Sequence, residues 1–329
     1  MRVFVTGGTG FVGRRLIGRL HAEGAAITAF VRPGSDASPL PAGVRRVSGA
    51  LDAAGPLSRE LRETLAEADA IIHCAARLFA PGWQEYLRAN ILLTEGLARA
   101  VAAHGDRVRR IIHLSSLAAA GPCAHAPGIS EEARPAPVSA YGWSKLLAEL
   151  VMEKHLGKDR LLILRPPIVY GPEDRALAPL FRLAARGLLL QAGMKPAPCS
   201  FLYVDDLVDA LLLCLQGQPA AGAYHLDDGR ASSLREFGEL IARAAGRRPW
   251  HLPVPHPLLR IAAQGCALAA RCLPGAFLPL TPDKALEGRQ KGWLADGSKF
   301  RRDFGFTAGT SLETGIEETL RWLKRTGKL

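Results

Sequence analysis

The chain has 329 residues, of which 48% are hydrophobic, enough to bury a full α/β core together with a smaller lobe. Its formal net charge of +11 is spread along the chain without a basic run interleaved with aromatic residues, so the sequence does not predict nucleic-acid binding. A basic surface suits a phosphate-rich cofactor, and it equally suits plain solubility.

The cysteine pattern and the N-terminus indicate the cellular setting. Six cysteines without a Cys-x-x-Cys pair, mostly among apolar residues, indicate reduced thiols in a cytoplasmic protein. Because the chain begins directly with a predicted strand, we expect no signal peptide. No uncharged apolar run approaches the ~20 residues of a membrane-spanning helix. We predict no metal site.

Strand and helix patterns alternate up to about residue 165, which predicts a parallel, doubly wound sheet of the α/β class. Long helices are predicted over Trp83–His104 and Tyr141–Leu156. Beyond Pro166 prolines become frequent and the alternation loosens. The strands are predicted over residues 2–6, 25–31, 44–48, 69–74, 109–115 and 161–165.

A glycine-rich loop, Gly7-Gly-Thr-Gly-Phe-Val-Gly13, joins the first predicted strand to the first predicted helix. Gly7 allows a tight turn, Gly10 lets the backbone approach a pyrophosphate, and Gly13 lets the helix pack against the strand. The helix N-terminus adds free N–H groups and roughly half a positive charge. The order strand, loop, helix, strand predicts a dinucleotide site, and the alternative is a glycine-rich turn without a ligand.

The residues after the second predicted strand bear on the choice of dinucleotide. A site that prefers NAD usually places an acid there for the ribose 2′-hydroxyl. This chain has Arg32 in that neighbourhood and no acid before Asp36. Because a guanidinium suits a 2′-phosphate, the sequence favours NADP(H), with NAD(H) as the second choice and a solvated loop arginine as the alternative.

Tyr141 and Lys145 lie one helical turn apart in Tyr-Gly-Trp-Ser-Lys and so share a helix face. An ammonium beside a phenol is expected to lower the tyrosine pKa from about 10. A tyrosine that exchanges a proton near neutral pH is what carbonyl reduction or alcohol oxidation requires. On its own, the pair is more often a surface tyrosine and a surface lysine.

Together, the glycine loop and Tyr-x-x-x-Lys resemble the extended branch of the short-chain dehydrogenase/reductase superfamily, which includes the NAD(P)-dependent epimerases and dehydratases. The resemblance implies a Rossmann NAD(P)-binding domain over 1–165, to which segments near 201–245 return, and a mainly substrate-binding lobe over 166–329. Further family-like segments follow in order at His73–Ala76, Asn90, His113–Ser116, Leu164–Pro172, Phe201–Asp206 and Tyr224–Gly229.

By this resemblance Ser116 polarises the substrate oxygen, Tyr141 is the acid/base, and Lys145 tunes it and binds ribose. Ser115 is the less favoured candidate for the hydroxyl, and for Asn90 the alternative is a buried amide satisfied by backbone. The implied cofactor contacts are Gly7, Gly10, Phe11, Val12, Gly13, Arg32, Ala75, Ala76, Asn90, Tyr141, Lys145 and Pro166.

Departures from the family pattern narrow the reaction. Ser116 is followed by Leu-Ala where the 4,6-dehydratases have Asp-Glu, and Pro167-Ile168 and Cys199-Ser200 replace residues that hold the diphosphate in nucleotide-sugar epimerases. The family's Gly-Asp near the adenine reads Gly49-Ala50 here, with Asp52 as an uncertain substitute. The pattern is more similar to 3β-hydroxysteroid dehydrogenases and dihydroflavonol reductases.

We therefore expect an NADP(H)-dependent oxidoreductase for an apolar, steroid- or isoprenoid-like alcohol or ketone. The alternatives are a nucleotide-sugar epimerase with bound NAD and a non-catalytic cofactor-binding regulator. A homodimer or monomer is expected. The apolar segment 257–280 fits a substrate pocket, a subunit interface or peripheral membrane contact, with ordinary core packing ahead of each. Capping boxes predict helix starts at Ser233 and Thr310.

Overall fold

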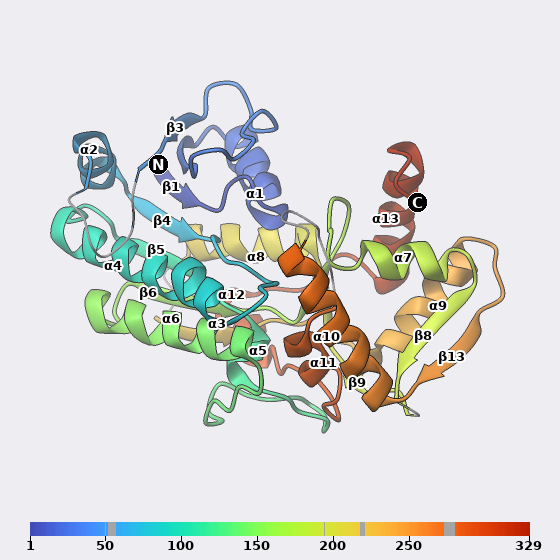
Figure 1. Ribbon diagram of the computed structural model, residues 1–329. Helices are drawn as coiled ribbons and strands as arrows, with labels where there is room; N and C mark the ends of the chain where they lie inside the picture. The colour runs from blue at the N-terminus through green and yellow to red at the C-terminus, as the bar shows by residue number, and fades with distance from the viewer. Residues whose placement is uncertain (50, 52–56, 194, 218–220, 273–279) are drawn as a thin grey trace.

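A seven-stranded sheet dominates the computed structural model, which describes residues 1–49, 51, 57–193, 195–217, 221–272 and 280–329 (Figure 1). All its strands are parallel, in the order β11-β6-β5-β4-β1-β2-β3. The order reverses between β1 and β4, which is the switch point of a doubly wound Rossmann sheet. The predicted α/β fold is confirmed.

The six predicted strands are present, each within one residue of its expected ends. Their apolar runs are buried because helices cover both faces of a parallel sheet. The strands are β1 (Arg2–Thr6), β2 (Ala26–Phe30), β3 (Arg45–Val47), β4 (Ala70–His73), β5 (Arg110–Leu114) and β6 (Leu161–Arg165), and β11 (Gly222–His225) adds a seventh.

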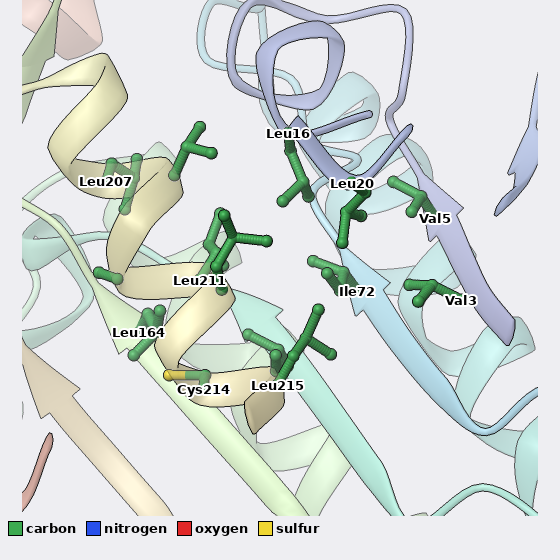
Figure 2. Close-up of a cluster of buried hydrophobic side chains, with 14 of the residues drawn as sticks. Val3, Val5, Leu16, Leu20, Ile72, Leu164, Leu207, Leu211, Cys214 and Leu215 are labelled. Carbon is green, nitrogen blue, oxygen red and sulfur yellow. The ribbon is translucent and has the colours of Figure 1, made fainter. Parts of the chain in front are cut away.

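Two hydrophobic clusters, one on each face of the sheet, hold the layers together. On one face α1 (Phe11–Ala22) lies beside α8 (Val204–Gln216), and Leu16, Leu20 and Leu211 meet side chains of the strands (Figure 2). The other face is covered by α2 (Arg59–Glu67), α4 (Leu93–His104) and α6 (Ala140–Leu156). These clusters fix the carboxyl ends of the strands, where ligands bind in this fold.

The helix predicted over Trp83–His104 is continuous in space but changes its hydrogen-bonding pattern. It runs as α3 (Trp83–Tyr86), a π-helical segment (Leu87–Leu92) and then α4. Such π segments are uncommon and frequently lie at functional sites. Here the segment carries the buried Asn90.

The remaining elements form a smaller set of short strands and helices beside the sheet (Figure 1). Parallel pairs join β7 to β10 and β8 to β13, and an antiparallel pair joins β9 to β12. Their bounds are β7 (Ile168–Tyr170), α7 (Ala178–Ala184), β8 (Leu188–Ala192), β9 (Pro198–Cys199), β10 (Phe201–Tyr203), β12 (Ser232–Ser233), α9 (Leu234–Ala244), β13 (Trp250–Val254), α10 (His256–Cys272), α11 (Pro282–Glu287), α12 (Ser298–Phe304) and α13 (Leu312–Arg325).

One of the two predicted helix starts is correct and the other is wrong by one residue. Ser233 caps α9 by accepting the Glu236 N–H at 3.1 Å. The last helix is capped by Ser311, which accepts the Thr314 N–H at 3.1 Å. Thr310 is not the cap because the helix begins at Leu312, which makes Ser311 the residue at the cap position.

Candidate active site

The hydroxyls of Ser116 and Tyr141 meet at the carboxyl end of β5. Ser116 follows this strand and caps α5 (Leu117–Ala120), while Tyr141 lies in the first turn of α6. Ser139 caps α6 by accepting the Gly142 N–H at 2.9 Å. The Ser116 hydroxyl hydrogen-bonds to the Tyr141 hydroxyl. Two side chains that the sequence placed 25 positions apart are therefore in direct contact.

The neighbouring Ser115 points elsewhere. Its side chain is buried, and its hydroxyl donates to the Glu149 carboxylate. Glu149 in turn forms a buried ion pair with Arg165, at 2.6 Å between Nη2 and Oε2. Since Ser115 is engaged in this network, Ser116 is the serine whose hydroxyl faces the tyrosine. Tyr141, Lys145 and Glu149 recur every four residues, so they share one face of α6.

Lys145 is almost fully buried, with 2% of its surface exposed. Its Nζ donates to the Leu114 carbonyl at 2.7 Å. Burial lowers its pKa to about 8, while the Glu149 and Cys74 side chains act in the opposite direction. The ammonium is thus held at the end of β5, one turn along the helix from Tyr141.

The sequence-based expectation that Lys145 lowers the pKa of Tyr141 is wrong. Burial raises the pKa of Tyr141 above its usual value, and the carboxylates of Glu287 and Asp283 raise it further. The hydrogen bond from Ser116 opposes them. The reason is that the phenol is buried and lies near two acids of the C-terminal part, while the lysine is bound to backbone. Tyr141 is accordingly protonated at neutral pH.

Those acids belong to α11, which the sequence did not assign to the site. Asp283 accepts the N–H groups of Ala140 and Tyr141 at 2.6 and 3.0 Å, so it caps the helix that carries Tyr141 from another part of the chain. Glu287 accepts the Ser139 hydroxyl at 2.6 Å. The Lys284 ammonium lies 4.5 Å from the centre of the Tyr141 ring, a cation–π distance. The short helix therefore contacts Tyr141 through Asp283 and Lys284, and it contacts the cap residue Ser139 through Glu287.

We expect Asp283→Ala to lower the free energy of unfolding by about 1–3 kcal/mol, because two N–H groups at the helix start lose their acceptor. It should also lower kcat/KM, since Tyr141 occupies that first turn. The matched control is Asp206→Ala, because Asp206 accepts the N–H groups of Gly309 and Thr310. Thermal unfolding and activity are measured for both. If the two variants were equally stable and lost the same activity, Asp283 would have no specific role in positioning Tyr141.

The glycine loop has the geometry that a dinucleotide needs. Gly7 has φ +73°, and a Cβ there would lie 2.6 Å from the Ala75 nitrogen. A Cβ on Gly13 would lie 2.2 Å from the Gly7 oxygen, so this glycine packs against the turn itself. Gly10 is exposed and starts α1, whose first turn holds no acidic residue. The helix N-terminus can therefore receive a pyrophosphate.

The other predicted cofactor contacts differ in their burial and in their position relative to the strands. Phe11 and Val12 form the half-buried first turn of α1, and Ala75 and Ala76 lie after β4, separated from it by Cys74. Pro166 is buried after β6, and its carbonyl accepts the Leu117 N–H at 2.9 Å. Ala50 and the predicted substitute Asp52 lie outside the described residues.

Asn90 has the contacts of a buried amide satisfied mainly by backbone, which was the alternative to a cofactor contact. Its amide accepts the Arg77 N–H at 2.7 Å, and it donates to the Arg77 carbonyl at 3.1 Å and to the Ser144 hydroxyl at 2.8 Å. The residue thus ties the segment after β4 to α6. A direct contact of Asn90 with a cofactor stays a prediction.

A Rossmann sheet with an open glycine loop and a serine–tyrosine pair beside a buried lysine defines a dinucleotide-dependent oxidoreductase-type enzyme. The family model described as the NAD dependent epimerase/dehydratase family matches residues 3–226. The chain belongs to this family, whose members are extended short-chain dehydrogenases/reductases.

Individual relatives fall into two groups by substrate. The 4-hydroxy-2-methyl-3-oxo-4-farnesyl-3,4-dihydroquinoline-1-oxide ketoreductase of Stigmatella aurantiaca is 29% identical, over 96% of this chain and 95% of its own. The UDP-glucose 4-epimerase of Vibrio cholerae is 31% identical over 77% of this chain and 78% of its own. The solved structure of MoeE5 with UDP-glucuronic acid and NAD has a TM-score of 0.75 and is 27% identical. The match covers 99% of this chain and 100% of the MoeE5 chain. The protein is therefore an NAD(P)-dependent enzyme of this oxidoreductase and epimerase family.

Proposed function

We propose that the protein is an NADP(H)-dependent oxidoreductase that interconverts a secondary alcohol and a ketone on an apolar, steroid- or isoprenoid-like substrate. The observation that carries the proposal is the contact between the Ser116 and Tyr141 hydroxyls, with the ammonium of Lys145 one helical turn away. The similarity to a ketoreductase of a farnesyl-bearing substrate supports the apolar class.

Each residue has a distinct part in this chemistry. Tyr141, protonated at neutral pH, donates its proton to the ketone oxygen during reduction. Ser116 hydrogen-bonds the same oxygen and positions it against the phenol. Lys145 offers its ammonium to the ribose hydroxyls. The nicotinamide cofactor, when bound, supplies or accepts the hydride.

The segment around Cys199 and Ser200 argues against a nucleotide-sugar substrate. Each residue is only 3% exposed. The Ser200 hydroxyl accepts the Ala295 N–H at 3.1 Å, and its own N–H donates to the Trp293 carbonyl at 3.0 Å. A diphosphate requires accessible cations or donors, and these positions offer neither. The residues that replace the family's diphosphate contacts are used to hold the C-terminal part of the chain.

The surroundings of Arg32 support NADP(H). Arg32 is exposed just after β2, and no ion pair to it is present within the described ranges. The nearest acid along the chain, Asp36, accepts the Ser38 N–H at 2.9 Å, and hydrogen bonds from Ser38 lower its pKa. The guanidinium is thus available for a 2′-phosphate, while the carboxylate is engaged in its own turn.

We expect Arg32→Glu to weaken NADPH binding by about tenfold to a hundredfold, because a charge-assisted hydrogen bond to phosphate is lost. NADH binding should change little. The control is Arg62→Glu, the same charge change at an exposed position of α2. Both dissociation constants are measured by fluorescence titration. An unchanged ratio of NADPH to NADH affinity would remove the argument for NADP(H).

The function is tested by a dehydrogenase screen with NADP⁺ and NAD⁺ against sterols, other cyclic alcohols and nucleotide sugars. Turnover of an apolar alcohol that requires the Tyr141 hydroxyl supports the proposal. The second candidate, a nucleotide-sugar epimerase, is favoured by the similarity to the Vibrio enzyme and to MoeE5. Purification with NAD that does not exchange, together with turnover of a UDP-sugar only, would establish that candidate instead.

A further inference from the structure

The helix α10 leaves an apolar stripe in solvent. Leu258, Ile261 and Leu268 are 56%, 64% and 62% exposed, with the exposed Gly265 between the last two. Their spacing of three, four and three residues places all four on one side of the helix. A surface helix normally turns such a stripe toward the core and polar residues toward water. Within the part of the chain that the structure describes, this apolar stripe therefore has no partner.

The same helix already has a different side that packs against the protein. Ala263 is fully buried, Leu259 and Cys266 are half-buried, and α10 packs against α11 (Figure 1). The exposed Arg260 and Gln264 lie on a third, polar side. An apolar side beside a basic polar side is the pattern of helices that lie in the plane of a membrane surface.

The charge of the surrounding chain points to an anionic surface. From residue 240 to residue 282 there is no aspartate or glutamate. The basic residues of this segment are Arg243, Arg247, Arg248, Arg260 and Arg271. A basic segment free of acids is attracted by the anionic lipids of a membrane. A second copy of this basic chain would instead meet like charge here.

We propose that α10 docks on the surface of a bilayer that contains anionic lipids. Leu258, Ile261 and Leu268 enter the boundary between headgroups and acyl chains, and Arg260 reaches the phosphates. The helix lies along the surface and does not cross it. In the part of the chain that the structure describes, no helix has both the length and the apolar character needed to span a bilayer.

The position of α10 relates the proposed docking surface to the candidate active site. The chain runs from α10 to α11, whose Asp283 caps the helix that carries Tyr141. A substrate that partitions into the bilayer would thus meet the protein at a helix that packs against α11. This consequence rests on the proposed function, whereas docking itself does not and is tested without an activity assay.

The test is flotation of the full chain with phosphatidylcholine vesicles, with and without phosphatidylglycerol. We expect binding to the vesicles that contain phosphatidylglycerol, and its weakening as salt is raised. The double variant Ile261→Ser/Leu268→Ser, and separately Arg260→Glu, should each lower partitioning by about tenfold or more. Thermal unfolding of each variant shows that it is folded.

Two matched controls and one further measurement decide the outcome. Leu234→Ser removes a leucine that is 48% exposed on α9, and Arg325→Glu reverses an exposed charge on α13. Both should bind vesicles like the parent. Absence of binding, or binding that the α10 variants leave unchanged, would overturn the proposal. So would a dimer in sedimentation velocity that the double variant converts to monomers, because the stripe would then be an interface between copies.

Discussion

Tyr141→Phe should lower the turnover number by about a hundredfold to ten-thousandfold, because it removes the group that we propose exchanges the proton. The ring stays in place: it lies 6.1 Å from the Tyr86 ring and below the Lys284 ammonium. Only the hydroxyl, with its hydrogen bond to Ser116, is lost. We expect the free energy of unfolding to change by about 1 kcal/mol at most, and NADPH affinity to stay within about a factor of two.

A matched control is available in the same cluster. Tyr86 is buried, and its hydroxyl donates to the Leu78 carbonyl at 3.2 Å and to Asp283 at 3.3 Å. Tyr86→Phe therefore removes a buried phenol hydroxyl without touching Ser116. Turnover of this variant should remain close to that of the parent. If Tyr141→Phe kept a tenth or more of the activity, acid/base catalysis by Tyr141 would be refuted.

The sheet and the glycine loop could be predicted from sequence because their signals are local. β6 reads Leu-Leu-Ile-Leu before its last residue, Arg165, as expected for a strand covered on both faces. Gly7 and Gly13 lie where a side chain would collide with nearby backbone, so residues with a side chain do not fit at these positions. The proximity of Ser116 to Tyr141 also followed, since the carboxyl ends of parallel strands meet at one edge.

The contacts of α11 could not be predicted because they join distant parts of the chain. Thr281-Pro282 is a recognisable helix start, with a threonine cap and a proline in the first turn. Nothing local indicates that Asp283 will cap a helix that begins more than a hundred residues earlier. The pKa of Tyr141 was predicted in the wrong direction for the same reason. The Tyr-x-x-x-Lys spacing gives the separation of the two residues along the helix. Burial and the acids of α11 decide whether the Tyr141 phenol is protonated.

Lys145→Met is expected to abolish turnover and, at the same time, to stabilise the protein against unfolding. Burial lowers the pKa of Lys145 from 10.5 to about 8, so the folded protein holds the ammonium less favourably than the unfolded chain does. Each pKa unit corresponds to about 1.4 kcal/mol. The lost hydrogen bond to the Leu114 carbonyl offsets part of this gain. A net increase of about 1–3 kcal/mol in the free energy of unfolding at pH 7 follows.

The pH dependence of this gain is its distinguishing feature. Below pH 8 the lysine is charged in both states, so the full cost of burial is present in the parent. Between about 8 and 10.5 the folded state loses its proton first, and the stability of the parent rises with pH. The difference between parent and Lys145→Met should therefore shrink over this interval, as measured by urea unfolding at pH 7 and pH 10.

Arg165→Met supplies the contrast, because it leaves the buried Glu149 carboxylate without its cation and should destabilise the protein by about 3–5 kcal/mol. A Lys145→Met variant that is less stable than the parent at pH 7, or a difference independent of pH, would show that Lys145 supports the fold. The expected result, a more stable variant whose gain shrinks as the pH rises, would show that Lys145 does not support the fold. The ammonium is then kept at a cost in stability, and only a function that needs a cation beside Tyr141 accounts for it.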